Sequence, residues 1–319
     1  MKKFLASVLA AAAVVSSAFS LASCSSGEPG EKDLENVQSK GTIVVGMECA
    51  YAPYNWSQTT ASEYTVEVKS GMYADGYDVQ VAKKIAEELN VTLVIQPLDW
   101  DGLIPALNSK TIDLVIAGMS PTAERKLSID FSDTYYDSNL VMVIRKDGAY
   151  TNATKISDFA GAKITGQLNT FHYSVIDQIA GVNKQTALAD FAALTTALKS
   201  KAVDGYVCEK PGAVSAVTAY SEFTYIEFAE GDGFTCDPEE SSIAVGLRKG
   251  STLTASVNEA IGKISKAQRE EMMLAAIARQ PVSESIGLQN SGTKEQREEY
   301  GAKKRDGNEA CGTINLNGI

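Results

Sequence analysis

The 319-residue chain contains a single histidine, His172, and no Cys-x-x-Cys pair. Zinc sites and Ser-His-Asp or Cys-His catalysis need sets of imidazole and thiolate groups, so the chain has little material for either. Walker-type loops and Gly-x-Gly-x-x-Gly phosphate loops are also missing. We therefore expect no metal site, no cofactor and no catalytic residues of these kinds.

Positive charge is in the minority, with 29 Lys and Arg residues against 40 Asp and Glu residues. The net charge is −11, and no basic cluster of the kind that nucleic-acid binding requires is visible. We expect no nucleic-acid partner, and the acidity mainly favours solubility. A hydrophobic content of 44% over this length allows about two domains with real cores.

One apolar run stands out, from Phe4 to about Phe19, between Met1-Lys-Lys and Leu21-Ala-Ser-Cys24. It is too short and too lightly flanked for a stable membrane span and is typical of a secretory signal. The ending Leu-Ala-Ser-Cys resembles a bacterial lipobox, which would make Cys24 the lipid-modified first residue of the mature protein. We expect a signal peptide over 1–24 and a flexible tether over 25–37 that holds the folded body at the outer membrane face.

The remaining cysteines are Cys49, Cys208, Cys236 and Cys311. Their spacing follows no disulfide framework, and a chain of this size needs no covalent staples. We expect no essential disulfide, with Cys49 and Cys208 as free buried thiols in apolar surroundings.

A stretch from Ile112 to Lys126 has the composition of an anion site. A short β-branched run, typical of a strand buried on both faces, passes into small residues, the hydroxyl of Ser120 and then Arg125. The planar guanidinium of an arginine matches a carboxylate or phosphate with two parallel hydrogen bonds. The alternative is that Arg125 is a surface cation in an ordinary strand-to-helix turn.

Strand-like and helix-like segments alternate along the chain, which predicts parallel sheets covered by helices. Strands are expected at 42–45, 91–96, 112–116, 140–144, 162–165, 203–208 and 242–247. Helices are expected at 78–89, shortly after 98, and at 172–180, 190–200, 211–220 and 253–264. A capping box at Ser265 and Gln268 predicts a last helix that ends near 280. Residues 55–71 could form a hairpin or a long loop, and the tail 283–319 has no period and is expected to be loosely ordered.

Six motifs follow one another in register between about Ile43 and Gly250. They are Tyr51-Ala-Pro-Tyr54, Asp75-Gly-Tyr-Asp78, the segment 98–107, the segment 112–125, the segment 129–136 with its Tyr-Tyr pair, and Val203-Asp-Gly-Tyr-Val-Cys-Glu209. With these motifs the chain resembles the extracellular solute-binding protein family 3, the substrate-binding lipoproteins of polar amino-acid ABC transporters.

The resemblance implies a two-lobed α/β fold of the periplasmic-binding-protein type II, with two hinge strands and a ligand cleft between the lobes. The implied boundaries are 38–136 for the first lobe, 137–238 for the second lobe and 239–282 for the return to the first. It also implies a monomer that passes a small amino acid to an ABC permease with its ATPase, at the bacterial surface or in the periplasm.

The resemblance also assigns roles to residues. Arg125 would pair with the ligand's α-carboxylate, helped by Ser120 and by the backbone around Ala117, Gly118 and Thr170. Glu209 stands where the family keeps an aspartate that accepts from the α-ammonium, so the charge is kept but the side chain is one methylene longer.

The other implied contacts lie around the ligand's side chain. Tyr51 and Trp100 would enclose its aliphatic part, and Glu48 would face its end. Asn169, Thr170 and Phe171 belong to the second-lobe loop 167–172, which departs from the usual Gly-Ser/Thr type. As alternatives, Tyr51 and Trp100 are ordinary core residues, Glu48 pairs with a lysine, and His172 faces solvent or caps a helix.

Glu48 decides the expected ligand class. A second acid favours a cationic or amide side chain over an acidic one. Two other functions stay open: a dehydratase-like enzyme with Glu48 or Glu209 as acid or base in the cleft, and a ligand-sensing or adhesin lipoprotein.

Overall fold

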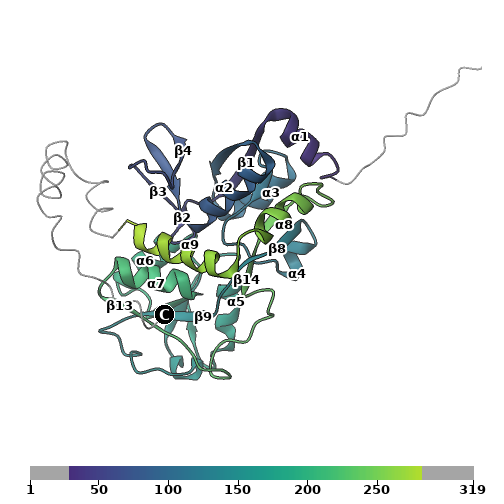
Figure 1. Cartoon of the computed structure of the whole chain (residues 1–319). Coiled ribbons are helices and arrows are strands. Elements are labelled where there is room, and N and C mark those ends of the chain that lie inside the picture. The colour runs from purple at the N-terminus through teal and green to yellow at the C-terminus, as the bar shows by residue number, and fades with distance from the viewer. Residues whose placement is uncertain (1–28, 282–319) are drawn as a thin grey trace, which may run out of the picture.

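The computed structural model describes residues 29–281, whose strands form two five-stranded sheets and one four-stranded sheet. The first sheet, in the order β6-β1-β7-β14-β8, contains β1 (Thr42–Met47), β6 (Thr92–Pro97), β7 (Leu114–Val115), β8 (Asp130–Asp137) and β14 (Ser242–Leu247). The second, in the order β11-β10-β12-β9-β13, contains β9 (Leu140–Arg145), β10 (Lys163–Thr165), β11 (Asn183–Lys184), β12 (Gly205–Glu209) and β13 (Phe223–Ile226). Figure 1 shows the elements around the first sheet in the upper lobe and those around the second in the lower lobe.

The first lobe has a parallel centre, because β1 pairs in parallel with both β6 and β7. The connections are α2 (Tyr77–Leu89), then the short η1 (Trp100–Gly102) with α3 (Leu103–Asn108). Helix α2 buries Val81, Ala82 and Ile85, and Asn90 ends it in the left-handed conformation with φ 52°. The predicted helix over 78–89 is therefore confirmed, and its apolar stripe covers the sheet.

The second lobe repeats this arrangement, with β10 parallel to β11 and β12. Its helices are η2 (Ile156–Phe159), α5 (Phe171–Ser174), η3 (Val175–Gln178), α6 (Phe191–Lys199) and α7 (Lys210–Ala219). Asp190 caps α6 by accepting from the Ala193 N–H at 2.7 Å, as its sequence position predicts. The single helix expected over 172–180 is wrong, because α5 lasts one turn and continues as the 3₁₀ segment η3.

Two chain crossings join the lobes. Residues 138–139 lead from β8 to β9, and the return passes through Ser241 into β14. The Ser138 N–H donates to the Ser241 carbonyl at 3.1 Å, so the two crossings run side by side. This is the geometry of a double-stranded hinge.

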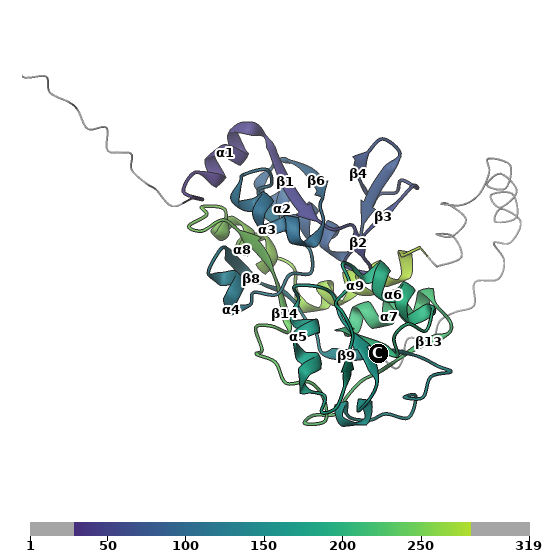
Figure 2. The ribbon, with the colours of Figure 1, turned by 180° about the vertical axis from the view of Figure 1, so that it is seen from behind.

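Of the last two helices, α9 contacts both lobes. Helix α8 (Thr254–Gly262) packs against α2 and β8 of the first lobe, and α9 (Lys266–Arg279) starts at the predicted capping box of Ser265 and Gln268. At the far end of α9, Arg279 pairs with Asp75 in the first lobe at 2.9 Å. Gln280 follows and donates to the Ser215 carbonyl in α7 at 3.1 Å. Figure 2 shows α9 lying next to α6 and α7 where the two lobes meet.

Residues 50–75 form the third sheet, in the order β2-β3-β5-β4, which resolves the choice between hairpin and loop for 55–71. Its strands are β2 (Ala50–Tyr51), β3 (Asn55–Gln58), β4 (Val66–Lys69) and β5 (Met72–Asp75). The sheet projects from the first lobe in both views (Figures 1 and 2). No helix within residues 29–281 is both long and apolar enough to cross a membrane.

The cysteines of the described range fit the sequence prediction. Cys49 and Cys208 are buried free thiols, and Cys236 is also free. Cys24, Cys311, the signal segment 1–24 and the tail 283–319 lie outside the described residues.

The predicted tether over 25–37 is wrong for its last residues, because Asp33–Lys40 forms helix α1. Asp33 is 1% exposed and forms a buried ion pair with Arg248, with an N–O distance of 2.8 Å. Arg248 also donates to the carbonyl oxygens of Leu107 at 3.0 Å and Ile112 at 2.6 Å. The partner lies 215 residues away in sequence, so a local pattern could not indicate that this segment is held.

We expect Asp33→Ala to lower the free energy of unfolding by about 3 kcal/mol, because the buried Arg248 guanidinium loses its nearest counter-ion and keeps only the Asp113 carboxylate at 3.4 Å. Urea unfolding followed by circular dichroism measures this change. Glu35→Ala removes an exposed acid from the same helix turn and is the matched control. Equal unfolding midpoints for the two variants would contradict this account of α1.

Candidate functional site

Buried polar atoms without a hydrogen-bond partner gather between the lobes. Among residues 29–281 they are Glu48 Oε2, Tyr54 Oη, Glu209 Oε1 and both ring nitrogens of His172. An unpaired polar atom kept from water costs free energy, so such atoms in a folded protein mark places where another group supplies the partner. Here the atoms come from both lobes, which locates the candidate site in the cleft.

Strand ends bring these residues together. Glu48 follows β1 in the first lobe, while Glu209 is the last residue of β12 in the second. The loop 166–170 follows β10, the parallel neighbour of β12. Ligands of open α/β sheets bind outside the carboxyl ends of the strands, and the two lobes present such ends to one cleft.

Arg125 lies in the short helix α4 (Ala123–Lys126), where the Thr122 hydroxyl accepts from the Arg125 N–H at 3.3 Å. Its guanidinium donates to the carbonyl oxygens of Ser120 at 2.9 Å and Asn169 at 3.2 Å. It also lies 5.0 Å from the centre of the Trp100 ring, a cation–π distance. Burial lowers the pKa of Arg125 to about 10, so it stays a cation at neutral pH. Two of its five N–H groups are used here, and the others remain for an anion.

Asn169 connects the second lobe to the first. Its carbonyl accepts from Arg125 and from Trp100 Nε1 at 3.4 Å, and its Nδ2 donates to Asp101 at 2.8 Å. The Thr170 hydroxyl stabilises the same loop by donating a hydrogen bond to the Gln167 carbonyl at 2.8 Å. These contacts hold the lobes in a closed arrangement.

A cavity of about 620 Å³ lies beside these contacts. Its lining includes Trp100, Arg125, Asn169, Thr170 and Phe171. Aromatic walls with a cation at one end suit a small ligand that carries an anionic group.

Glu48 holds the other charged position of the cleft. Its Oε1 accepts from Gln167 Nε2 across the cleft at 2.9 Å, while its Oε2 has no partner. Burial raises the pKa of Glu48 to about 8, against the opposing effect of the Gln167 hydrogen bond. The negative charges of Asp190, Asp99 and Asp78 contribute to the same rise of the pKa. At neutral pH the Glu48 carboxyl is therefore largely protonated, and a cation bound beside it would displace this proton and offset the surrounding negative charge.

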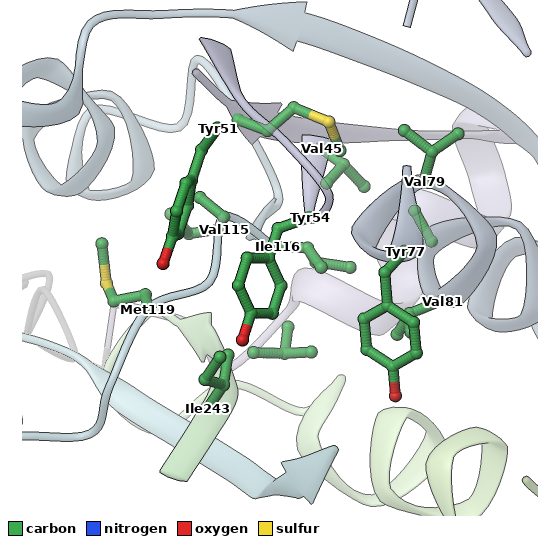
Figure 3. Packing of buried hydrophobic residues seen from close by; sticks show 14 of the residues in the cluster. Val45, Tyr51, Tyr54, Tyr77, Val79, Val81, Val115, Ile116, Met119 and Ile243 are labelled. Carbon is green, nitrogen blue, oxygen red and sulfur yellow. The ribbon is translucent and has the colours of Figure 1, made fainter. Parts of the chain in front are cut away.

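Two aromatic rings and a glycine turn pack against the Tyr51 ring. Its ring stacks on Phe191 of the second lobe with centroids 4.0 Å apart, and lies 4.8 Å from the Tyr54 ring. Figure 3 shows Tyr51 and Tyr54 in one buried layer with Val115. A Cβ at Gly118, where φ is +61°, would stand only 3.0 Å from the Tyr51 ring, so this turn requires glycine.

Glu209 is 1% exposed and contacts a side chain from each lobe. The Tyr51 hydroxyl donates to its Oε2, and His172 Nε2 lies 2.8 Å from its Oε1. The His172 contact is close but does not form a well-aligned hydrogen bond, since neither His172 Nε2 nor Glu209 Oε1 has a hydrogen-bond partner among the described residues. Burial raises the pKa of Glu209, but the charge of His172 and the Tyr51 hydrogen bond outweigh it and leave the pKa below its usual value.

The sequence pattern of the bacterial extracellular solute-binding proteins, family 3, matches residues 43–274 of this chain. The chain belongs to this family. One curated relative is the arginine-binding extracellular protein of Bacillus subtilis, 28% identical over 267 residues that make up 82% of this chain and 92% of the relative. Another is the L-cystine-binding protein of Escherichia coli K12, 29% identical over 73% of this chain and 81% of the relative.

A solved structure supports the same conclusion about the fold. The amino-acid ABC transporter substrate-binding protein of Streptococcus pneumoniae, bound to L-arginine, aligns with a TM-score of 0.65. It is 26% identical and covers 76% of this chain and 98% of its own. The predicted two-lobed fold is thus confirmed for this solute-binding protein.

The structure of this family 3 protein brings the predicted site residues to one cleft. Trp100 and Arg125 from the first lobe, with Asn169, Thr170 and Phe171 from the second, line the cavity. Glu48, Tyr51 and Glu209 are outside that lining and lie between the lobes through the Glu48–Gln167 and Tyr51–Glu209 contacts, with Tyr51 in the hydrophobic core. Ala117, Gly118 and Ser120 are buried in the turn that leads to Arg125. Their roles toward a ligand stay predictions.

Two of the alternatives for side chains at the site are wrong. His172 does not face solvent, because it is 4% exposed and contacts Glu209. Glu48 does not pair with a lysine, since its partner is Gln167.

The sequence analysis missed three contacts of the cleft. They are those of Gln167 with Glu48, His172 with Glu209 and Phe191 with Tyr51. The one available signal was the only histidine of the chain, two residues after the Asn169-Thr170 pair.

The raised pKa of Glu48 predicts a pH effect on the ligand-free protein. The carboxyl releases its proton near pH 4.5 when unfolded and near pH 8 when folded. Between these values unfolding releases a proton, so the free energy of unfolding falls as pH rises, by at most about 1.4 kcal/mol per pH unit. We expect Glu48→Gln to lose this component, so that the variant gains stability relative to the wild type from pH 5 to pH 8. Thermal unfolding over that range measures the difference, and a constant difference would contradict the assignment.

Proposed function

We propose that this solute-binding protein is the substrate-binding component of an ABC importer for a polar L-amino acid, with a cationic side chain preferred and an amide next. The observation that carries this proposal is the unpartnered Glu48 Oε2, buried in the cleft among further acids. A guanidinium, ammonium or amide group would donate to it, whereas an acidic side chain would add repulsion.

Arg125 supports the proposed binding of the ligand's α-carboxylate. Its free N–H groups would bind the α-carboxylate, with Trp100 stacked against the guanidinium on one side. In a closed cleft with little water, both ionic contacts gain strength. The ligand would thus be held at two charged ends, both by side chains of the first lobe.

The relatives support the same ligand class. Those named above are described as binding arginine and cystine, and a Campylobacter jejuni relative as a probable histidine-binding protein. We assign one lobe to 38–136 with 239–282, to which the start of helix α1 adds 33–37, and the other lobe to 137–238. The monomer would deliver its ligand to a permease with an ATPase subunit.

Calorimetry with L-arginine, L-lysine, L-histidine, L-glutamine, L-cystine and L-glutamate tests the proposal. We expect arginine to bind with micromolar or tighter affinity, which corresponds to about 8 kcal/mol of binding free energy. We expect Arg125→Ala to weaken this binding at least about 100-fold, because it removes a charge-assisted bidentate contact. Tight glutamate binding without arginine or glutamine binding would contradict the role of Glu48.

Lys126→Ala is the matched control for Arg125→Ala. Lys126 neighbours Arg125 in α4 but pairs with Glu239 at the surface. We expect unchanged arginine affinity for this variant, and a loss equal to that of Arg125→Ala would point to damage of α4 instead.

A protonated Glu48 would also suit a general acid, which keeps the enzymatic alternative testable. Incubation of the purified protein with prephenate-like acids should leave them unchanged. Turnover that Glu48→Gln abolishes would favour the enzyme over the transport protein.

We also propose that the protein is anchored through a lipid on Cys24. Cys24→Ser removes the thiol that would carry the lipid, so we expect the protein to move from the membrane fraction to the soluble fraction. Immunoblotting of fractionated cells measures this shift, with Cys236→Ser as the control. Persistence of the Cys24→Ser protein in the membrane fraction would contradict lipidation.

A further inference from the structure

Both carboxylate oxygens of Glu209 lie close to a side chain of the protein itself. One carboxylate oxygen accepts from the Tyr51 hydroxyl, and the other lies 2.8 Å from His172 Nε2. Both partners are almost fully buried, Tyr51 at 3% and His172 at 4% exposure. A ligand ammonium that is to pair with Glu209 must therefore compete with His172 in a space that the two side chains already fill.

Packing keeps both partners in place. Tyr51 is stacked on Phe191 at 4.0 Å with only 10° between the ring planes, and Gly118 lies against its other face. The His172 ring lies 4.4 Å from the Phe171 ring and 6.1 Å from the Phe191 ring. Moving either partner away from Glu209 would disturb a cluster that spans both lobes.

The length of the Glu209 side chain also indicates that its carboxylate contacts protein groups rather than a ligand ammonium. The resemblance places an aspartate at this position, and Glu209 carries one methylene more. The longer carboxylate reaches Tyr51 and His172, and its Oε1, which has no hydrogen-bond partner, still lies 2.8 Å from His172 Nε2. Glu48 Oε2 likewise has no hydrogen-bond partner, and the one side-chain partner of its carboxylate is the neutral Gln167. The cleft therefore offers a ligand one cation, Arg125, and one acid without a histidine beside it, Glu48.

We propose that His172 is a specificity-determining residue that occupies the place beside Glu209 that a ligand's α-ammonium would otherwise take. The ligand class then includes carboxylic acids that carry a distal cation but no free α-amino group. Arg125 holds the carboxylate of such a ligand and Glu48 its distal cation. This inference rests on the proposed binding of cationic amino acids. It extends the ligand class, because a ligand then no longer needs an α-amino group.

Three ligands and three forms of the full chain test this inference by calorimetry. The ligands are L-arginine, 5-guanidinopentanoic acid, which is arginine without its α-amino group, and agmatine, which is arginine without its carboxylate. For the wild type we expect the first two to bind within about tenfold of each other and agmatine at least about 100-fold more weakly. A site that pairs Glu209 with the ammonium would instead lose about 100-fold or more for 5-guanidinopentanoic acid, and this result would overturn the inference.

His172→Gln removes the imidazole ring and keeps a hydrogen-bond donor near Glu209. We expect the preference for arginine over 5-guanidinopentanoic acid to rise at least about tenfold, because Glu209 is then left for the ammonium. Lys184→Ala removes a cation from β11, where Lys184 pairs with Asp177 outside the cleft, and should leave the preference unchanged. A merely structural role of His172 would weaken both ligands equally, and an unchanged ratio in His172→Gln would overturn the inference.

The same measurements separate this inference from the proposed function. Arginine binding without 5-guanidinopentanoic acid binding refutes the role of His172 and leaves the transport proposal intact. Absence of binding for all the cationic amino acids refutes both. If His172→Gln does not fold, the wild-type comparison of the two carboxylates decides alone.

Discussion

A carboxylate removed from water has to be paired, and in this solute-binding protein the carboxylate of Glu209 is paired by both lobes at once. Tyr51 reaches it from the first lobe, while His172 lies beside it in the second. Because an unpaired buried charge is strongly unfavourable, the closed position of the lobes depends on this contact. The stacking of Tyr51 on Phe191 adds apolar contact between the same surfaces.

The remaining charges of the cleft are less completely satisfied. Arg125 donates to backbone carbonyls of both lobes but uses only part of its donor capacity, and Glu48 keeps one oxygen without a partner. Such local deficits destabilise a fold unless function requires them, and they gather at binding sites for that reason. The raised pKa of Glu48 expresses the same deficit, since the proton there partly substitutes for a missing cation.

Local physics made much of the fold predictable. The apolar stripe of α2, the N-cap at Asp190 and the capping box at Ser265 act within a few residues, so a single sequence reveals them. The sequence did not indicate helix α1, because the helix is stabilised by an ion pair between Asp33 and Arg248, a residue distant in sequence. The one-turn α5 was overestimated because the apolar residues after His172 pack into the second lobe core without continuing the helix.

The sequence by itself determined which chemical groups are available and roughly where each strand ends: an arginine after a buried strand, acids after two others, and aromatic residues beside them. Motifs in register were also sufficient to indicate the family and its two lobes. Only the tertiary structure decided the pairing, because contacts across the cleft join residues 119 positions apart, as for Glu48 and Gln167, or 158 apart, as for Tyr51 and Glu209. Whether a carboxylate is free for a ligand or already held by a histidine depends on those distances, which no local pattern encodes.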